Sequence, residues 1–150
     1  MEILIATSKH IEAITGFQMD MALESEGTKL DRERVKQGVS AVIDDANKGL
    51  YLVAEHSGRA IGSLMITREW SDWNNAWYWW IQSVFVLPEF RGQGTFRAML
   101  TKVKEMASEQ QVSEIRLYVD KDNKSAQEVY AKLGLKECNY QMLSINLLYL

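Results

Sequence analysis

Residues 84–96 read Val84-Phe85-Val86-Leu87-Pro88-Glu89-Phe90-Arg91-Gly92-Gln93-Gly94-Thr95-Phe96, an apolar strand that stops at a proline and continues into a glycine loop. Gly92 and Gly94 let backbone N–H groups approach a ligand closely, and Arg91 adds a cation. Beyond the loop, apolar residues recur every three or four positions, which predicts an amphipathic helix. They are Phe96, Met99, Leu100, Val103, Met106 and Ala107. The first turn of such a helix favours anions, so we expect a ligand that carries phosphate.

Two other phosphate-binding loops do not fit these residues. The Walker loop requires Gly-Lys-Ser/Thr where this chain has Gly94, Thr95 and Phe96. The dinucleotide-binding fingerprint requires a third glycine where Arg97 stands. A glycine-rich turn that only enters a helix remains the alternative, so the loop alone does not name its ligand.

A second segment, residues 123–135, predicts another helix with both ends marked. Asn123 is suited to the N-cap, and Gly134 stands where a left-handed residue ends a helix. The apolar face consists of Ala126, Val129, Tyr130 and Leu133. Residues 115–119 alternate between apolar and polar side chains, which predicts a strand before this helix.

Together these segments resemble the motifs of the GNAT superfamily of N-acetyltransferases. One motif of that family reads R/Q-x-x-G-x-G/A, and residues 91–96 match it except at Phe96. The other reads N-x-x-A-x-x-x-Y-x-x-x-G-F, and residues 123–135 match it except for Leu135 at the aromatic position. The resemblance extends over residues 50–137, and two motifs at the proper separation are more specific than either alone.

The resemblance implies an α+β fold in which residues 1–150 form one N-acetyltransferase domain. A mixed, mostly antiparallel sheet, flanked by about four helices, would open at the acetyl-CoA site. Acetyl-CoA would be the acyl donor, with its pantetheine arm along the strand and its pyrophosphate on the loop. The residues implied to bind it are Val84, Phe85, Val86, Arg91, Gly92, Gln93, Gly94, Thr95, Phe96 and Asn123.

Phe96 is the main departure from the family pattern, which prefers glycine or alanine where the backbone approaches the pyrophosphate. A phenylalanine fits there only if its side chain turns away from the ligand. Its spacing to Leu100 and Val103 predicts that the helix directs the ring into the core.

Acetyl transfer requires a neutral amine, a stabilised oxyanion and a proton for the departing thiolate. By resemblance, Tyr130 supplies that proton as the amine attacks directly in a ternary complex. The alternative is a core tyrosine on an apolar helix face. Gln82 stands where related diamine acetyltransferases carry a glutamate base, and it cannot take up a proton at neutral pH. The carboxylates that could replace it, directly or through water, are Glu24, Glu26, Glu69, Asp72 and Glu89.

The acceptor side is indicated by the tryptophans, all five of which lie between residues 70 and 80. Aromatic residues favour strands, so most of them are expected in the sheet. Trp73 falls in a turn, where it could form an aromatic, acidic mouth for an alkylammonium group. We expect the substrate-binding residues to be Glu24, Glu26, Asp72, Trp73 and Gln82, and the acceptor to be a small cationic amine. A protein N-terminus or lysine as acceptor, and a non-catalytic acyl-CoA sensor, are the alternatives.

Composition excludes several other classes. The chain of 150 residues carries 17 basic and 20 acidic residues, a net charge of −3 without a basic stripe, so nucleic acid is not expected as a partner. Cys138 is the single cysteine, and the two histidines, His10 and His56, lack ligand spacing, so no metal site is expected. No stretch predicts a membrane span or a leader, which favours a cytoplasmic protein.

The remaining sequence predicts a strand at residues 2–6, helices around residues 11–21 and 35–43 with Asp31 as a cap, and a hairpin over residues 50–68. A turn at residues 71–75 leads into the long strand that ends at Val86. Apolar residues at 140–147 predict a further strand, which could cover its own sheet or that of a partner in a homodimer.

Overall fold

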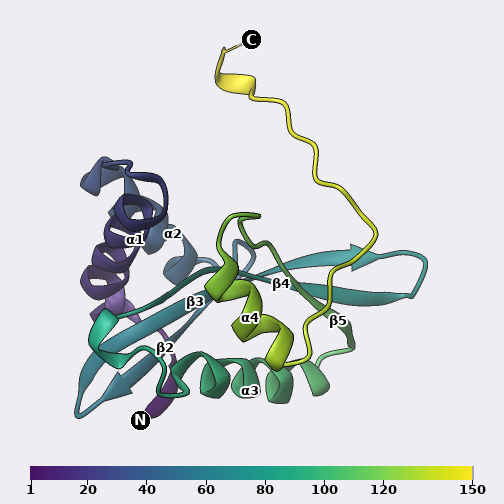
Figure 1. The fold of residues 1–150 in the computed structure, drawn as a ribbon, viewed down its shortest axis with the longest axis horizontal. Helices are drawn as coiled ribbons and strands as arrows, with labels where there is room; N and C mark the ends of the chain where they lie inside the picture. Colours follow the sequence, from purple (N-terminus) through teal and green to yellow (C-terminus); the bar gives the residue numbers. More distant parts are fainter. Residues whose placement is uncertain (150) are drawn as a thin grey trace. The chain divides into compact units, whose positions relative to one another are not determined.

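The first part of the chain forms a mixed five-stranded sheet with the strand order β1-β2-β3-β4-β5 (Figure 1). The four N-terminal strands are antiparallel, and β5 runs parallel to β4. This computed structural model describes residues 1–149 and divides into two compact units, which meet between Tyr118 and Val119 in the sequence. The strands, all in the first unit, are β1 (Glu2–Ile5), β2 (Leu50–His56), β3 (Arg59–Ser71), β4 (Ala76–Val86) and β5 (Val112–Leu117).

Helices cover both faces of the sheet in the first unit. The helices α1 (Ile11–Glu26) and α2 (Arg32–Asp44) pack together on one face, and α3 (Thr95–Ser108) packs on the other (Figure 1). Tyr51 and Val53 of β2 are buried among α1 and α2 residues. The predicted cap of α2 is confirmed, because the Asp31 carboxylate accepts from the backbone N–H of Glu33 at 3.1 Å. Short 3₁₀ turns cover Ser8–His10 and Pro88–Phe90.

The sheet opens along the second half of β4. A β-bulge lies there, since Leu64 of β3 stands opposite both Ser83 and Val84, and Ser83 has a φ of +55°. On its other side, β4 pairs with β5 only up to the contact of Ile81 with Leu117. Beyond Ile81, the end of β4 therefore has no strand of residues 1–149 beside it on the β5 side. The α+β class and the mixed sheet agree with the prediction.

The second unit contains α4 (Lys124–Lys132), and both predicted ends of this helix are confirmed. Asn123 Oδ1 accepts from the Ala126 N–H at 3.1 Å, which caps the N-terminus. At the other end Gly134 has a φ of +92°, and the N–H of Leu135 reaches back to the Tyr130 carbonyl at 3.0 Å. This is the Schellman arrangement, for which a glycine is favoured.

The strand predicted at residues 140–147 is absent. Residues 135–146 form neither helix nor strand, and a 3₁₀ turn follows at Leu147–Tyr149. The large apolar side chains of this segment are between 71% and 87% exposed; they are Tyr140, Met142, Leu143, Ile145, Leu147 and Leu148. The alternating pattern alone was insufficient, because a strand also needs a neighbour to accept and donate its backbone hydrogen bonds.

Candidate functional site

The glycine loop leads directly from the end of β4 into α3. Gly92 and Gly94 have φ values of +72° and +82°, and Gly94 is the N-cap of the helix. A Cβ at either position would meet no atom within 4 Å, so the backbone conformation requires glycine and the space beside it is open. No side chain among the described residues caps α3, which leaves its positive end accessible to an anion. These features suit a phosphate group.

Gln93 and Thr95 contact backbone carbonyls just before the loop and so stabilise its conformation. The Gln93 amide donates to the Glu89 carbonyl at 2.9 Å, and Thr95 is buried with its hydroxyl 3.5 Å from the Phe90 carbonyl. Phe96 was expected to turn its ring into the core, and the structure shows this residue partly buried. Thr95, the residue before it, is buried at the start of α3. Binding by this loop would therefore rest on its backbone groups.

The β3–β4 ladder fixes where the last peptide groups of β4 point. Leu87 N–H donates to the Ile61 carbonyl at 2.8 Å, and Gly62 lies opposite Val86. In an antiparallel ladder this pattern directs the N–H and C=O of Val86 away from β3. They face the side where β5 no longer pairs, and alternation places the peptide groups of Val84 on that side too.

Phe85 is turned the other way. A Cβ on Gly62 would lie 2.8 Å from the Phe85 carbonyl oxygen, so this peptide group faces β3. Its buried ring stacks on Phe17 of α1, with centroids 5.3 Å apart. Among the three strand residues expected to contact a pantetheine arm, Val84 and Val86 thus present their backbone to the open side.

Arg91 and Glu24 form an ion pair that the sequence did not indicate. The Arg91 Nη1 and Nη2 atoms donate to the two oxygens of the Glu24 carboxylate at 2.6 and 2.9 Å. The Nε atom donates to the Val86 carbonyl at 2.8 Å, and the guanidinium lies 5.3 Å from the centre of the Phe85 ring. The hydrogen bond from Arg91 lowers the pKa of the Glu24 carboxyl, and the same bond raises the pKa of Arg91. In this structure Glu24 is therefore occupied by Arg91.

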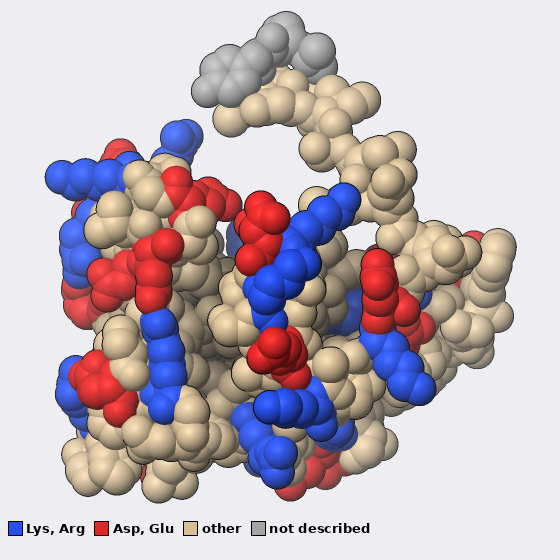
Figure 2. Space-filling model, in the orientation of Figure 1, with Lys and Arg blue, Asp and Glu red and all other residues tan. Residues whose placement is uncertain are grey.

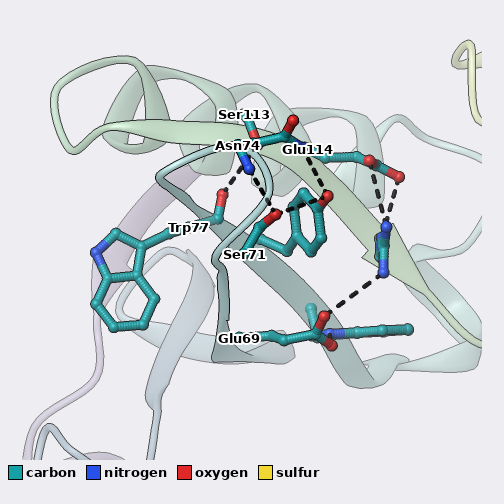
Figure 3. Close-up of polar contacts among 9 residues, drawn as sticks. Glu69, Ser71, Asn74, Trp77, Ser113 and Glu114 are labelled. Atoms are coloured by element: carbon teal, nitrogen blue, oxygen red, sulfur yellow. Dashed lines mark hydrogen bonds and ion pairs between the residues drawn. The ribbon is translucent and has the colours of Figure 1, made fainter.

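A polar cluster lies farther along β3, β4 and β5, and consists of Glu69, Tyr78, Trp80, Glu114 and Arg116. Figure 3 shows Glu69 and Glu114 reaching the same guanidinium from different strands, with Arg116 Nη1 3.8 Å from Glu69 and Nε 3.0 Å from Glu114. The indole N–H of Trp80 donates to Glu69 at 3.1 Å, and Arg116 lies 3.9 Å from the centre of the Tyr78 ring. Two carboxylates and one guanidinium leave the cluster with a net negative charge.

The cluster continues toward the open part of β4 through Gln82. The Gln82 Nε2 atom donates to Thr67 Oγ1 at 2.9 Å, so its amide oxygen remains available as an acceptor. The strand register places Gln82 opposite Met65, which packs against the α1 and α2 core. Gln82 and Trp80 therefore share the sheet face on which α1 lies.

A family model described as acetyltransferase (GNAT) matches residues 12–135. The chain belongs to the GNAT acetyltransferase family. A solved structure described as a possible acetyltransferase from Clostridium difficile 630 is 35% identical, with a TM-score of 0.90 and 97% of each chain covered. An aminoglycoside N-acetyltransferase in complex with CoA has a TM-score of 0.81 over 97% of this chain and 94% of that one; at 17% identity it shows the shared fold alone.

Curated GNAT relatives match shorter stretches. An N-acetyltransferase from Archaeoglobus fulgidus is 34% identical over 86 residues, 57% of this chain and 58% of that protein. Thialysine N-epsilon-acetyltransferase from Bos taurus is 36% identical over 58 residues, 39% of this chain and 34% of that enzyme. Both matches cover less than two-thirds of the relative's own length.

In this GNAT chain, the expected acidic mouth is not assembled. Asp72 and Trp73 lie in the turn before β4, whereas the loop that contacts Glu24 follows the other end of this strand. The strand has 11 residues, and at about 3.3 Å per residue it spans roughly 35 Å. Trp73 is 90% exposed at the far turn, and Glu26 is exposed at the end of α1. The sequence already places Asp72 and Trp73 before this strand and Arg91 after it, but only the contact with Arg91 shows which end of β4 Glu24 lies near.

The second GNAT motif lies in the other compact unit. The Asn123 cap uses the side-chain oxygen, which leaves the amide nitrogen to donate to a ligand. Tyr130 is half-buried, and this burial raises the pKa of its hydroxyl above the ordinary value. The hydroxyl therefore holds its proton throughout the neutral range, as a proton donor must.

Other kinds of site find little support within residues 1–149. None of the helices there is long and apolar enough to cross a membrane, and the same residues contain no group of three His, Cys, Asp or Glu side chains that could hold a metal ion. Figure 2 shows basic and acidic side chains interspersed over the visible face.

Proposed function

We propose that this protein transfers the acetyl group of acetyl-CoA to a primary amine on a small cationic acceptor. The observation that carries the proposal is the open edge of β4, which leads into a glycine loop at the uncapped start of α3. An extended ligand arm that ends in a pyrophosphate fits this combination of features. Acetyl-CoA would supply the activated acetyl thioester.

The donor would be held mainly by backbone groups. Val84 and Val86 would pair with the pantetheine amides as a neighbouring strand does, and residues 92–96 would direct peptide N–H groups at the pyrophosphate. The Asn123 amide nitrogen would contact the pantetheine arm. For Tyr130, the family motif and the raised pKa support the role of proton donor to the departing thiolate.

The acceptor would lie on the α1 face of the sheet beside Gln82. The Gln82 amide oxygen can accept a hydrogen bond from the attacking nitrogen, and the polar cluster offers a net negative charge together with the indole of Trp80. Glu26 would add to this field from the end of α1. Trp80 was not expected at the site from the sequence, although the alternation of Thr67 with Glu69, and of Trp80 with Gln82, could have indicated a shared face. The name of the bovine relative gives a lysine analogue as its substrate, which supports an alkylamine.

The acetyl-transfer proposal is tested by measuring thiol release from acetyl-CoA with a panel of amines. An alkylamine with a pKa of about 10.4 arrives protonated, and each unit of pH yields about tenfold more of the neutral nucleophile. Because Gln82 cannot take a proton, we expect the rate to rise with pH between about 7 and 9. Thiol release with peptides alone would assign the acceptor to proteins, and binding without release would assign the protein to a sensor role.

Acceptor capture by the polar cluster predicts a specific effect of Glu69→Gln. The variant keeps a hydrogen-bond acceptor for Trp80 but removes the negative charge, so KM for a cationic acceptor should rise about 3- to 10-fold while kcat changes less. Asp72→Asn removes the same charge at the far turn and serves as the matched control with unchanged KM. Steady-state kinetics at low and high salt measures KM and kcat for both variants. A neutral best acceptor, or equal effects of the two variants, would contradict the assignment.

A further inference from the structure

We infer that Glu24 is a positioning residue that acts through Arg91, and that the pair holds the open end of β4 and the glycine loop in the shape that binds acyl-CoA. The inference rests on the proposed function. It assigns the Arg91 guanidinium to the protein's own backbone and to Glu24 rather than to the phosphates of the ligand.

The donors of Arg91 are directed at the protein. A guanidinium has five N–H groups. The Nε–H goes to the Val86 carbonyl, and one N–H on each Nη goes to the Glu24 carboxylate. This leaves two N–H groups, one on each Nη. The fork that would grip a phosphate in two places is already used by a carboxylate.

The bond to Val86 falls at a carbonyl that lacks a strand partner. The Val86 carbonyl faces the side of β4 beyond the last β5 contact, at Ile81. Arg91 therefore supplies there the donor that a longer β5 would have supplied. The bond satisfies the Val86 carbonyl, and the preceding part of the open β4 edge keeps its backbone groups available to a ligand.

Helix α1 holds the guanidinium directly through Glu24 and indirectly through Phe17. Glu24 binds it end-on, and Phe17 supports the Phe85 ring beneath it. The side chains of Arg91 and Glu24 are 41% and 50% exposed, and an ion pair this exposed adds little to stability. Its fixed geometry, with three hydrogen bonds joining α1, β4 and the loop, is more consequential for the shape of the ligand site.

The inference and a direct phosphate role predict opposite effects of Glu24→Gln. If Glu24 positions Arg91, removing the carboxylate loosens the loop and should weaken CoA binding by on the order of 10-fold. If Arg91 binds phosphate directly, the same change removes a negative charge near an anion and releases the guanidinium, so CoA should bind more tightly.

The experiment measures the Kd of CoA by calorimetry for the full chain and for Glu24→Gln, Arg91→Gln and the double variant. We expect each single variant to weaken binding about 10-fold, the double variant to be no weaker than either, and melting temperatures to change little. The matched control is Glu12→Gln, also on α1, which breaks ion pairs to Arg32 and Lys36 of α2 and should leave Kd unchanged. Tighter or unchanged binding by Glu24→Gln, or additive effects of the two changes, would overturn the inference. Absence of CoA binding by the unchanged chain would instead overturn the proposed function.

Discussion

Replacing Tyr130 by phenylalanine should lower kcat by about 100- to 10,000-fold, the range typical for loss of a general acid. The change removes one oxygen and leaves the ring on α4, so the melting temperature and the affinity for acetyl-CoA should stay near their original values. Because the step lost is proton delivery to the thiolate, KM for acetyl-CoA should change far less than kcat. Steady-state kinetics with the best acceptor, together with a thermal melt, measures the effect.

The matched control is Tyr51→Phe. Burial also raises the pKa of the Tyr51 hydroxyl, but this residue belongs to the core between β2 and the α1–α2 pair. We expect it to leave kcat unchanged even if it lowers stability. A Tyr130→Phe protein with the original kcat would make Tyr130 a packing residue and leave protonation of the thiolate to water or to another group.

The pH profile gives a second test of the same role. The pKa of Tyr130 is raised above its ordinary value of about 10, so the hydroxyl stays protonated between about pH 7 and 9, where the neutral fraction of the amine grows. A rate that rises with pH should therefore keep rising over this range, with no fall assignable to Tyr130 below about pH 10. A fall in kcat between pH 7 and 9 that disappears in Tyr130→Phe would contradict the raised pKa.

Local signals in the sequence predicted the elements that frame the site. Asn123 and Gly134 mark the ends of α4 because capping and left-handed geometry depend on the neighbouring residues alone. Likewise, Gly92 and Gly94 mark the loop because their positive φ values restrict the choice of residue.

What the sequence could not predict depends on contacts between distant residues. Glu24 and Arg91 are 67 positions apart, and only the packing of α1 beside the end of β4 brings them together. Each residue alone is an ordinary surface charge. Similarly, Asp72 and Glu24 were both candidate carboxylates, and it is the packing of α1, which places Glu24 beside Arg91 at the other end of β4, that separates them. Such pairings follow from topology rather than from local pattern.

The second large effect is expected from Gly94→Glu, which should abolish the stabilisation by acetyl-CoA. Unchanged protein at 100 times Kd should gain about 2.7 kcal/mol, a rise in melting temperature of roughly 5–10 °C for a chain of this size. CoA and dephospho-CoA should act alike, whereas adenosine should do little, because the pyrophosphate makes the loop contacts. In the variant, a carboxylate about 4 Å from a phosphate charge costs about 4 kcal/mol at an effective dielectric constant of 20, on the order of 1,000-fold in affinity.

Two controls separate the effect of the charge from the effect of backbone strain. Gly94 has a φ of +82°, and any residue with a side chain is strained in that conformation. Gly94→Gln has the same size and strain without the charge, and it should bind more tightly than Gly94→Glu. Gly58→Glu places the same charge at a φ of +75° in the β2–β3 turn, where a Cβ also meets open space, and it should keep the thermal shift. Because strain lowers the melting temperature of each unliganded variant, only the shift produced by ligand is compared. A full shift in Gly94→Glu would mean that acetyl-CoA does not approach this loop, and the glycines would then serve only the turn into α3.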